Sequence, residues 1–128
     1  MNPGSTNSWS RKAPAIGWAL LIFALSSIPS SALPKIALLT YDKLIHVIIF
    51  FIFGILVYFA FGLKGNSVSF RWSQSFMVLL IVIAYGVLDE FHQSFVPGRT
   101  PDFYDAMADT AGGCLSAVSV FLYTRMKN

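Results

Sequence analysis

Long apolar stretches alternate with short polar connections along the chain, and this pattern predicts four helices. No charged residue lies between Ala13 and Pro34, and three later stretches are nearly as free of charge. A bilayer core about 30 Å thick needs roughly 20 mostly apolar residues per helix, which is about the length of each stretch. We therefore expect helices near residues 14–31, 42–62, 74–95 and 103–124.

The predicted connections carry residues that end helices and form turns. Pro29 follows the first apolar stretch, where proline does not continue a helix. Between the third and fourth stretches, Pro97-Gly98 is typical of a type II turn, because glycine readily adopts the positive φ of the third position. Asp102 then suits the N-cap of the last helix, with Asp105 in its first turn, where the helix dipole favours a carboxylate.

The composition indicates a membrane protein. Of the 128 residues, 55% are hydrophobic and 12% are charged, whereas a soluble domain averages about 25% charged residues. So apolar a chain is not disordered, and its nine Lys and Arg residues form no phosphate-binding stripe, which excludes a nucleic-acid partner. One cysteine allows neither an intrachain disulfide nor a cysteine-based zinc site. The fold class that we expect is all-α, an integral membrane four-helix bundle.

The charges are divided between the two sides of this bundle. Because positive charge marks the cytoplasmic side, we expect both termini to be cytoplasmic, with residues 1–12 as a flexible segment and 13–125 as the four-span membrane domain. The basic residues on that side are Arg11, Lys12, Lys64, Arg71, Arg125 and Lys127. The opposite side receives Lys35, Lys43 and Arg99 together with all six acids, which are Asp42, Asp89, Glu90, Asp102, Asp105 and Asp109.

An alternative for the N-terminal stretch is a cleaved signal peptide. Arg11 and Lys12 would form its basic region, Ala15 to Leu25 its apolar core, and Ser30-Ser31-Ala32 a small-residue cleavage site. Cleavage would leave three spans, and the sequence leaves both alternatives open.

Polar side chains recur at helical spacing on the last three predicted helices. Asp42 and His46 are four residues apart, and so are Asp105 and Asp109, so each pair shares a helix face. Ionisable groups inside a membrane usually face a cavity or pair with one another. We therefore expect an outward-facing polar and acidic pocket formed by Asp42, Lys43, His46, Asp89, Glu90, Gln93, Arg99, Asp105 and Asp109.

The last helix also has a face suited to close helix packing. Ala108, Gly112 and Ser116 follow one another at intervals of four residues. Small residues in this pattern allow a neighbouring membrane helix to approach closely.

The chemistry-bearing residues resemble a known family, the VanZ-like membrane proteins. Their order and spacing are similar to the family's D-K-x-x-H, D-E-x-x-Q, R and D-x-x-x-N-x-x-G pattern. This chain departs from the pattern at Asp109, where the family usually has asparagine. An ionised carboxylate only accepts hydrogen bonds, so Asp109 must be protonated, pair with a cation or face water. The matching segments are Asp42-Lys43-Leu44-Ile45-His46, Asp89-Glu90-Phe91-His92-Gln93, Pro97-Gly98-Arg99 and Asp105 with Gly112.

The resemblance implies a multi-pass protein of the bacterial plasma (inner) membrane. It also implies a link to resistance against teicoplanin, a glycopeptide antibiotic, and to the cell envelope. It supplies no settled catalytic residues, so the site has to be judged by its chemistry.

Three functions remain open on this chemistry. The first is binding of a membrane lipid, a lipid-linked cell-wall precursor or a glycopeptide, with Arg99 holding a phosphate or carboxylate. The second is a small hydrolase or transferase in which His46 or Glu90 is the general acid or base. No nucleophile or specific metal motif accompanies these two residues, so the sequence does not identify an enzyme. The third is a structural partner of another envelope protein.

Two details of the expected pocket are also open. Arg99 is either a loop charge near lipid phosphates or a fixed partner for Asp89, Glu90 or Asp105, since its guanidinium suits both phosphate and carboxylate. No cofactor is predicted, although Asp89, Glu90 and Asp109 could together hold a divalent cation, since hard cations bind carboxylates.

Overall fold

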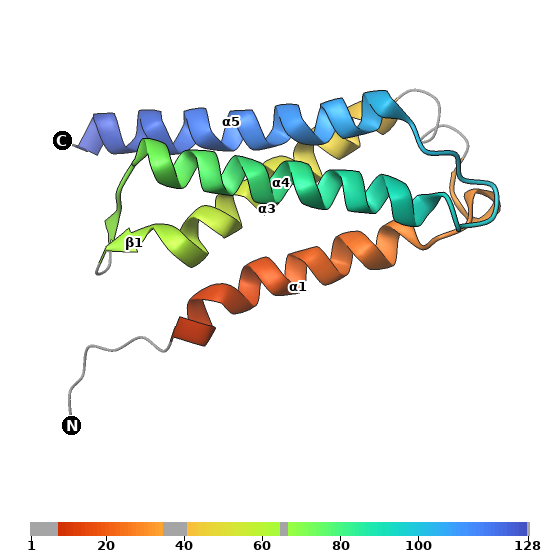
Figure 1. Ribbon diagram of the computed structural model, residues 1–128, viewed down its shortest axis with the longest axis horizontal. Helices are drawn as coiled ribbons and strands as arrows, with labels where there is room; N and C mark the ends of the chain where they lie inside the picture. The colour runs from red at the N-terminus through yellow and green to blue at the C-terminus, as the bar shows by residue number, and fades with distance from the viewer. Residues whose placement is uncertain (1–7, 35–40, 65–66, 128) are drawn as a thin grey trace.

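The computed structural model describes residues 8–34, 41–64 and 67–127, and it is an up-and-down helical bundle (Figure 1). Successive long helices run in opposite directions, and the start of the first helix and the end of the last lie at the same end of the molecule. Apart from one two-residue antiparallel ladder, the fold is all-α, as predicted. The elements are α1 (Ser8–Ser26), the 3-10 helix η1 (Ser30–Ala32), α3 (Asp42–Gly62), β1 (Leu63–Lys64), β2 (Ser67–Val68), α4 (Trp72–Gln93) and α5 (Phe103–Lys127).

The prediction of the first helix was wrong at both of its ends. It placed the helix at 14–31, whereas α1 begins at Ser8 and ends at Ser26. The early end has a physical cause, because Pro29 disfavours helical geometry at the residue before it and is followed by η1. Residues 8–12, assigned by sequence to a flexible segment, are helical, and residues 1–7 lie outside the described part of the chain. The other three helices agree with prediction to within about three residues.

Three helices of the described chain are long and apolar enough to cross a membrane. They are Asp42–Phe61 of α3, Trp72–Gln93 of α4 and Phe103–Lys127 of α5. The polar first turns of α1 leave only residues 13–26 as its apolar part. The protein is therefore a multi-pass membrane protein in which α1 is the shortest apolar element of the bundle.

The tightest packing joins α3 to α5 through the predicted small-residue face. Ala108, Gly112 and Ser116 are all buried on α5. A Cβ atom at Gly112 would lie 2.5 Å from the backbone oxygen of Val47 and 2.7 Å from the backbone nitrogen of Phe51, both on α3. Glycine at this position therefore brings the two backbones into direct contact.

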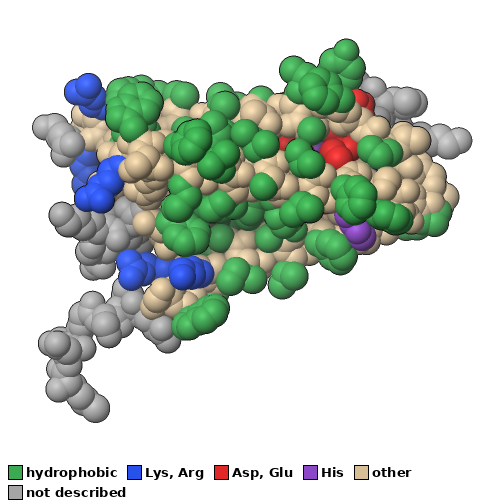
Figure 2. Space-filling model, in the orientation of Figure 1, with side chains coloured by type: hydrophobic (Ala, Val, Ile, Leu, Met, Phe, Trp, Pro, Cys, Tyr) green, Lys and Arg blue, Asp and Glu red, His purple; other side chains and the backbone are tan. Residues whose placement is uncertain are grey.

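The outer surface matches a protein that is solvated by lipid. Apolar side chains cover the face of the bundle shown in Figure 2, while Lys and Arg gather near one end and acids and histidine toward the other. On α4 and just beyond it, Leu88, Phe91 and Phe95 are each more than 60% exposed. The side of the membrane that each end faces stays a prediction.

The turn and the cap predicted between the last two helices are both present. Gly98 has a φ of +74°, and the N–H of Arg99 donates to the carbonyl of Val96 at 3.1 Å, which closes a β-turn. The backbone N–H of Tyr104 donates to Asp102 Oδ1 at 2.8 Å, which caps α5. The turn and the cap together fix where α5 begins relative to α4.

Candidate functional site

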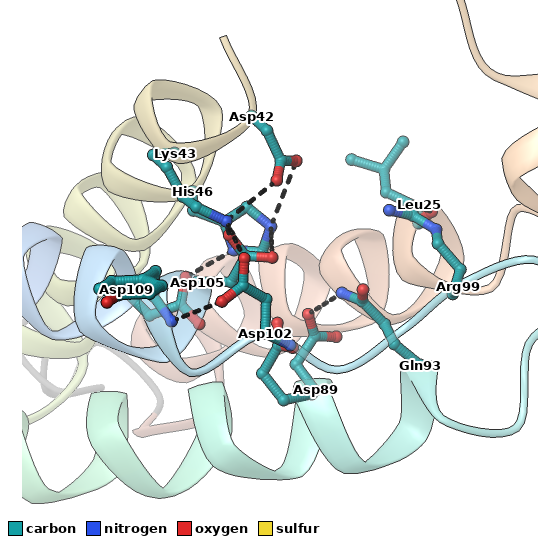
Figure 3. Close-up of polar contacts among 12 residues, drawn as sticks. Leu25, Asp42, Lys43, His46, Asp89, Gln93, Arg99, Asp102, Asp105 and Asp109 are labelled. Atoms are coloured by element: carbon teal, nitrogen blue, oxygen red, sulfur yellow. Dashed lines mark hydrogen bonds and ion pairs between the residues drawn. The ribbon is translucent and has the colours of Figure 1, made fainter. Parts of the chain in front are cut away.

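Lys43 lies at the centre of a group of acids at one end of the bundle (Figure 3). Its ammonium donates to Asp102 Oδ2 at 2.6 Å, to Asp42 Oδ2 at 3.4 Å, and also to Asp105 Oδ1. Asp102 lies in the loop before α5, and the hydrogen bond from Lys43 lowers the pKa of its carboxyl group below the ordinary value. The ion pairs of Lys43 thus connect the start of α3 to the start of α5.

His46 connects this group of acids to the interior of the bundle. Its Nδ1 lies 2.8 Å from Asp109 Oδ1, and the Asp109 side chain is only 1% exposed. On the other side of the ring, Nε2 lies 4.0 Å from Asp42 Oδ1 and 3.9 Å from Asp105 Oδ2. Because Asp109 comes from α5 and His46 from α3, the helix contact at Gly112 holds the two side chains together.

Glu90 extends the group onto α4. One of its carboxylate oxygens, Oε2, accepts a hydrogen bond from the backbone N–H of Asp102 at 2.8 Å. The other, Oε1, is buried and has no hydrogen-bond partner in the described chain, and the same is true of Asp109 Oδ2. We call the following set the ionic cluster: Asp42, Lys43, His46, Glu90, Asp102, Asp105 and Asp109.

Close packing of α4 leaves room for the Asp109 carboxylate. A Cβ atom at Gly86 would lie 2.8 Å from Asp109 Oδ2. Gly86, Asp89, Glu90 and Gln93 are all buried on α4, which is the face that the helical spacing predicts. The acids of α4 therefore face the bundle rather than the lipid.

A cavity of about 160 Å³ lies beside the ionic cluster, bounded by α1, α3, α4 and the adjoining loops. The apolar residues of the lining, which we call the apolar wall, include Ile22 and Leu25 of α1 and Ile45 and Ile49 of α3. The polar residues of the lining, which we call the polar wall, are Ser26, Asp42, His46, Asp89, Gln93 and Arg99. Within it, Gln93 Nε2 donates to Asp89 Oδ2 at 3.0 Å.

Arg99 binds the end of α1 and not an acid. Its Nε donates to the carbonyl of Ile28 at 3.2 Å, and Nη2 lies 3.5 Å from the carbonyl of Leu25. Among the described residues it makes no ion pair with Asp89, Glu90 or Asp105, so of the two alternatives for Arg99 the fixed carboxylate partner is not the one that the structure shows. The carbonyl groups at the end of a helix lack partners within the helix, and a guanidinium satisfies them well.

The structure brings the predicted site residues together in two neighbouring sets. These sets are the ionic cluster and the polar wall of the cavity, and they share Asp42 and His46. Helical spacing alone could not predict which residues belong to which set. The apolar wall on α1 could not be predicted from sequence, because Ile22 and Leu25 look the same in sequence as any lipid-facing apolar residues. His92 contacts α1 and the residue that follows it, since its Nε2 lies 2.9 Å from Ser27 Oγ and its ring packs on Phe23 at 4.4 Å between centroids.

Comparison with known proteins agrees with this arrangement of motifs. Residues 4–124 match the family model described as VanZ/LLP1. The chain belongs to this family. The resemblance drawn from the D-K-x-x-H and D-E-x-x-Q segments is thereby confirmed, and the match includes α1 as well as the three helices that carry the motifs.

A relative of this VanZ/LLP1 protein is known from a eukaryote. The chain is 30% identical over 86 residues to an uncharacterized protein of the fission yeast Schizosaccharomyces pombe. The match covers 67% of this chain and 50% of the yeast protein, so the chain spans about half the length of this curated relative. No solved structure matches the chain.

Proposed function

We propose that this VanZ-family membrane protein binds a membrane lipid, with part of the lipid headgroup region seated in the cavity between α1, α3 and α4. The observation that carries the proposal is that both apolar and polar side chains line the cavity. An amphipathic ligand satisfies both walls, because its apolar part contacts Ile22 and Ile49 while its polar part reaches Asp89 and Gln93.

The size of the cavity limits what enters it. A volume of about 160 Å³ is close to that of an engineered apolar cavity of ~150 Å³ that binds benzene. One ring-sized or short branched group therefore fits, and a whole lipid does not. The remainder of the lipid would lie along the exposed apolar faces of the helices, such as Leu88 and Phe91.

The polar wall favours a headgroup that both donates and accepts hydrogen bonds. Asp42 and Asp89 accept hydrogen bonds from hydroxyl or amino groups, and the Gln93 amide can donate as well as accept. Arg99 has five N–H donors, of which two face carbonyls of α1 and the adjoining turn. Its remaining donors suit a phosphate at the rim.

The proposed setting is the plasma membrane of a bacterium, with the ionic cluster toward the outer surface. There the ligand would be a cell-envelope lipid or a lipid-linked wall precursor, and loss of binding would change the response to a glycopeptide such as teicoplanin. Because a relative also exists in a yeast, we define the ligand by its chemistry, a lipid phosphate that carries hydroxyl groups.

Binding can be measured with a sugar-bearing polyprenyl phosphate and the full chain in lipid nanodiscs. Ile49→Trp fills the cavity and should weaken binding about tenfold because the ligand is excluded by the larger side chain. Arg99→Ala removes the phosphate donor and should also weaken binding about tenfold, since the loss of a charged hydrogen bond costs about 1.5–3 kcal/mol. Ile48→Trp is the matched control, because Ile48 is 48% exposed and its replacement should leave the affinity unchanged.

The same preparation separates binding from catalysis. A binding protein returns the polyprenyl phosphate intact, whereas a hydrolase or transferase releases product at a rate that Glu90→Gln reduces. Unchanged affinity in both Ile49→Trp and Arg99→Ala would contradict the proposal, provided that both variants are folded.

A further inference from the structure

We infer that His46, Glu90 and Asp109 form a binding site for one transition-metal dication of the Mn²⁺ to Zn²⁺ series. The three side chains come from α3, α4 and α5, and each offers one ligand atom, all within 4.8 Å of one another. The inference is argued separately from the lipid proposal, because Glu90 and Asp109 do not line the cavity and His46 is the one ligand that does.

Two buried carboxylate oxygen atoms without hydrogen-bond partners support cation binding at this site. Glu90 is 7% exposed and Asp109 is 0% exposed, and in each residue one carboxylate oxygen has no hydrogen-bond partner among the described residues. A buried acceptor without a partner loses its interaction with water and gains nothing in return. A metal ion bound by Glu90 Oε1 and Asp109 Oδ2 would satisfy both atoms.

The spacing of the three groups is close to that of a coordination shell. Ligand atoms held about 2.0–2.2 Å from a metal ion lie at most about 4.4 Å apart. The separations reach no more than 4.8 Å, so rotations that move these side chains by a few tenths of an ångström would complete the shell.

The charge balance of the ionic cluster also calls for a cation. Its five carboxylates are Asp42, Glu90, Asp102, Asp105 and Asp109, and the ion pairs within it are made by Lys43 and His46 alone. Lys43 contacts the acids at the mouth of the cluster and neither Glu90 nor Asp109. Asp109 pairs with His46, and Glu90 makes no ion pair among the described residues. A dication at the inner end would compensate these two carboxylates together.

The donor set selects the class of metal. One imidazole nitrogen and two carboxylate oxygens suit Mn²⁺, Fe²⁺, Co²⁺ and Zn²⁺, whereas Ca²⁺ and Mg²⁺ prefer oxygen ligands alone. The one cysteine, Cys114, is exposed and is not a member of either candidate ligand group in the described chain. Three protein ligands leave at least one coordination position open for water or an external ligand.

The test uses the full chain, purified in detergent, freed of metal with a chelator and then equilibrated with Zn²⁺, Mn²⁺ or Mg²⁺. We expect about one Zn²⁺ or Mn²⁺ per chain by mass spectrometry of the metal content, and no retained Mg²⁺. Glu90→Gln and Asp109→Asn should lower the affinity at least about tenfold, which is the size of effect typical of the loss of one supporting or ligating group. Asp102→Asn is the control, because it removes a carboxylate of the same cluster that is not a ligand.

Histidine coordination can be observed in the unaltered protein, which protects the test against variants that do not fold. The chain has two histidines, and bound Mn²⁺ or Co²⁺ should show the magnetic coupling of one imidazole nitrogen. His46→Gln should abolish this coupling and His92→Gln should preserve it.

Three outcomes would overturn the inference. They are the absence of stoichiometric metal, retention of full affinity in folded Glu90→Gln and Asp109→Asn, and a bound metal without nitrogen coupling. None of these outcomes bears on the lipid proposal, which is measured without added metal.

Discussion

The contact between α3 and α5 and the contact between α1 and the rest of the bundle are built in opposite ways. The first is a backbone contact at Gly112, with small residues on either side. The second combines the apolar packing of Ala15 and Ile22 with separate hydrogen bonds, such as that from Trp18 Nε1 to the carbonyl of Ile49 at 3.0 Å, and it leaves a cavity. The comparison shows that His46 and Asp109 of the ionic cluster lie on a closely packed pair of helices, while α1 packs less closely and lines a cavity.

The largest effect is expected where the two backbones touch. Gly112→Ala would place a methyl carbon 2.5 Å from the Val47 oxygen, which only a separation of α3 and α5 can relieve. We expect a loss of about 3 kcal/mol or more of folding free energy, at the upper end of the range for overpacking, together with loss of the His46–Asp109 contact. The measurement is the melting temperature in detergent.

A control for this substitution lies on α1. Nothing lies within 4 Å of a Cβ atom built at Gly17, so Gly17→Ala should leave stability unchanged or raise it by about 0.5–1 kcal/mol through helix propensity. Equal destabilisation by Gly17→Ala and Gly112→Ala would show that the close backbone contact at Gly112 is not the source of the loss.

An intermediate effect is expected at the hydrogen bonds of α1. The hydroxyl of Tyr85 donates to the carbonyl of Ala19 at 2.5 Å, and Tyr85→Phe removes this bond at a cost of about 1 kcal/mol. Amide hydrogen exchange should then accelerate in α1 and stay unchanged in α5. Tyr104→Phe is the control, because Tyr104 is 67% exposed. Faster exchange throughout the bundle would show that α1 is not a separate, weaker unit.

The smallest effect is expected at the exposed edge of the ionic cluster. Asp102→Asn keeps an N-cap residue for α5 and removes the ion pair with Lys43, so its melting temperature should fall by less than that of Asp102→Ala. Lys43 lowers the pKa of Asp102 in the folded protein. The ionised Asp102 carboxylate therefore stabilises the fold at every pH above the unfolded-state pKa of this group. That stabilisation is lost as the pH falls through the lower pKa that Asp102 has in the folded state.

Comparing melting temperatures at two pH values checks that small effect. The difference between the unaltered chain and Asp102→Asn should be present at neutral pH. It should disappear once the pH is well below the ordinary aspartate pKa of about 3.9. A difference that persists in acid would mean that the charge of Asp102 is not its source.

The sequence predicted the parts of the structure that depend on local chemistry. The bounds of α3, the turn at Gly98, the cap at Asp102 and the buried small face around Gly112 all follow from short-range rules. The common face of Glu90 and Gln93 follows from helical spacing. These features need no knowledge of how the helices are arranged.

The rest depends on contacts between helices, which spacing does not specify. For Arg99 the sequence left a lipid phosphate and a carboxylate partner open, and the structure shows instead hydrogen bonds to carbonyls at the end of α1. A polar pocket was predicted, and Asp42, His46 and Gln93 do line the cavity. Its apolar lining was not predicted, since the α1 residues that form part of it resemble any lipid-facing residue. The orphaned oxygens of Glu90 and Asp109 are likewise visible only in three dimensions.

The short apolar part of α1 has a consequence for the surrounding membrane. Residues 13–26 extend over ~21 Å at 1.5 Å per residue, well short of a hydrocarbon core of ~30 Å. A bilayer adapts to such a mismatch by thinning locally. Phosphate groups beside α1 should therefore sit deeper than those beside α3, within closer reach of the guanidinium of Arg99.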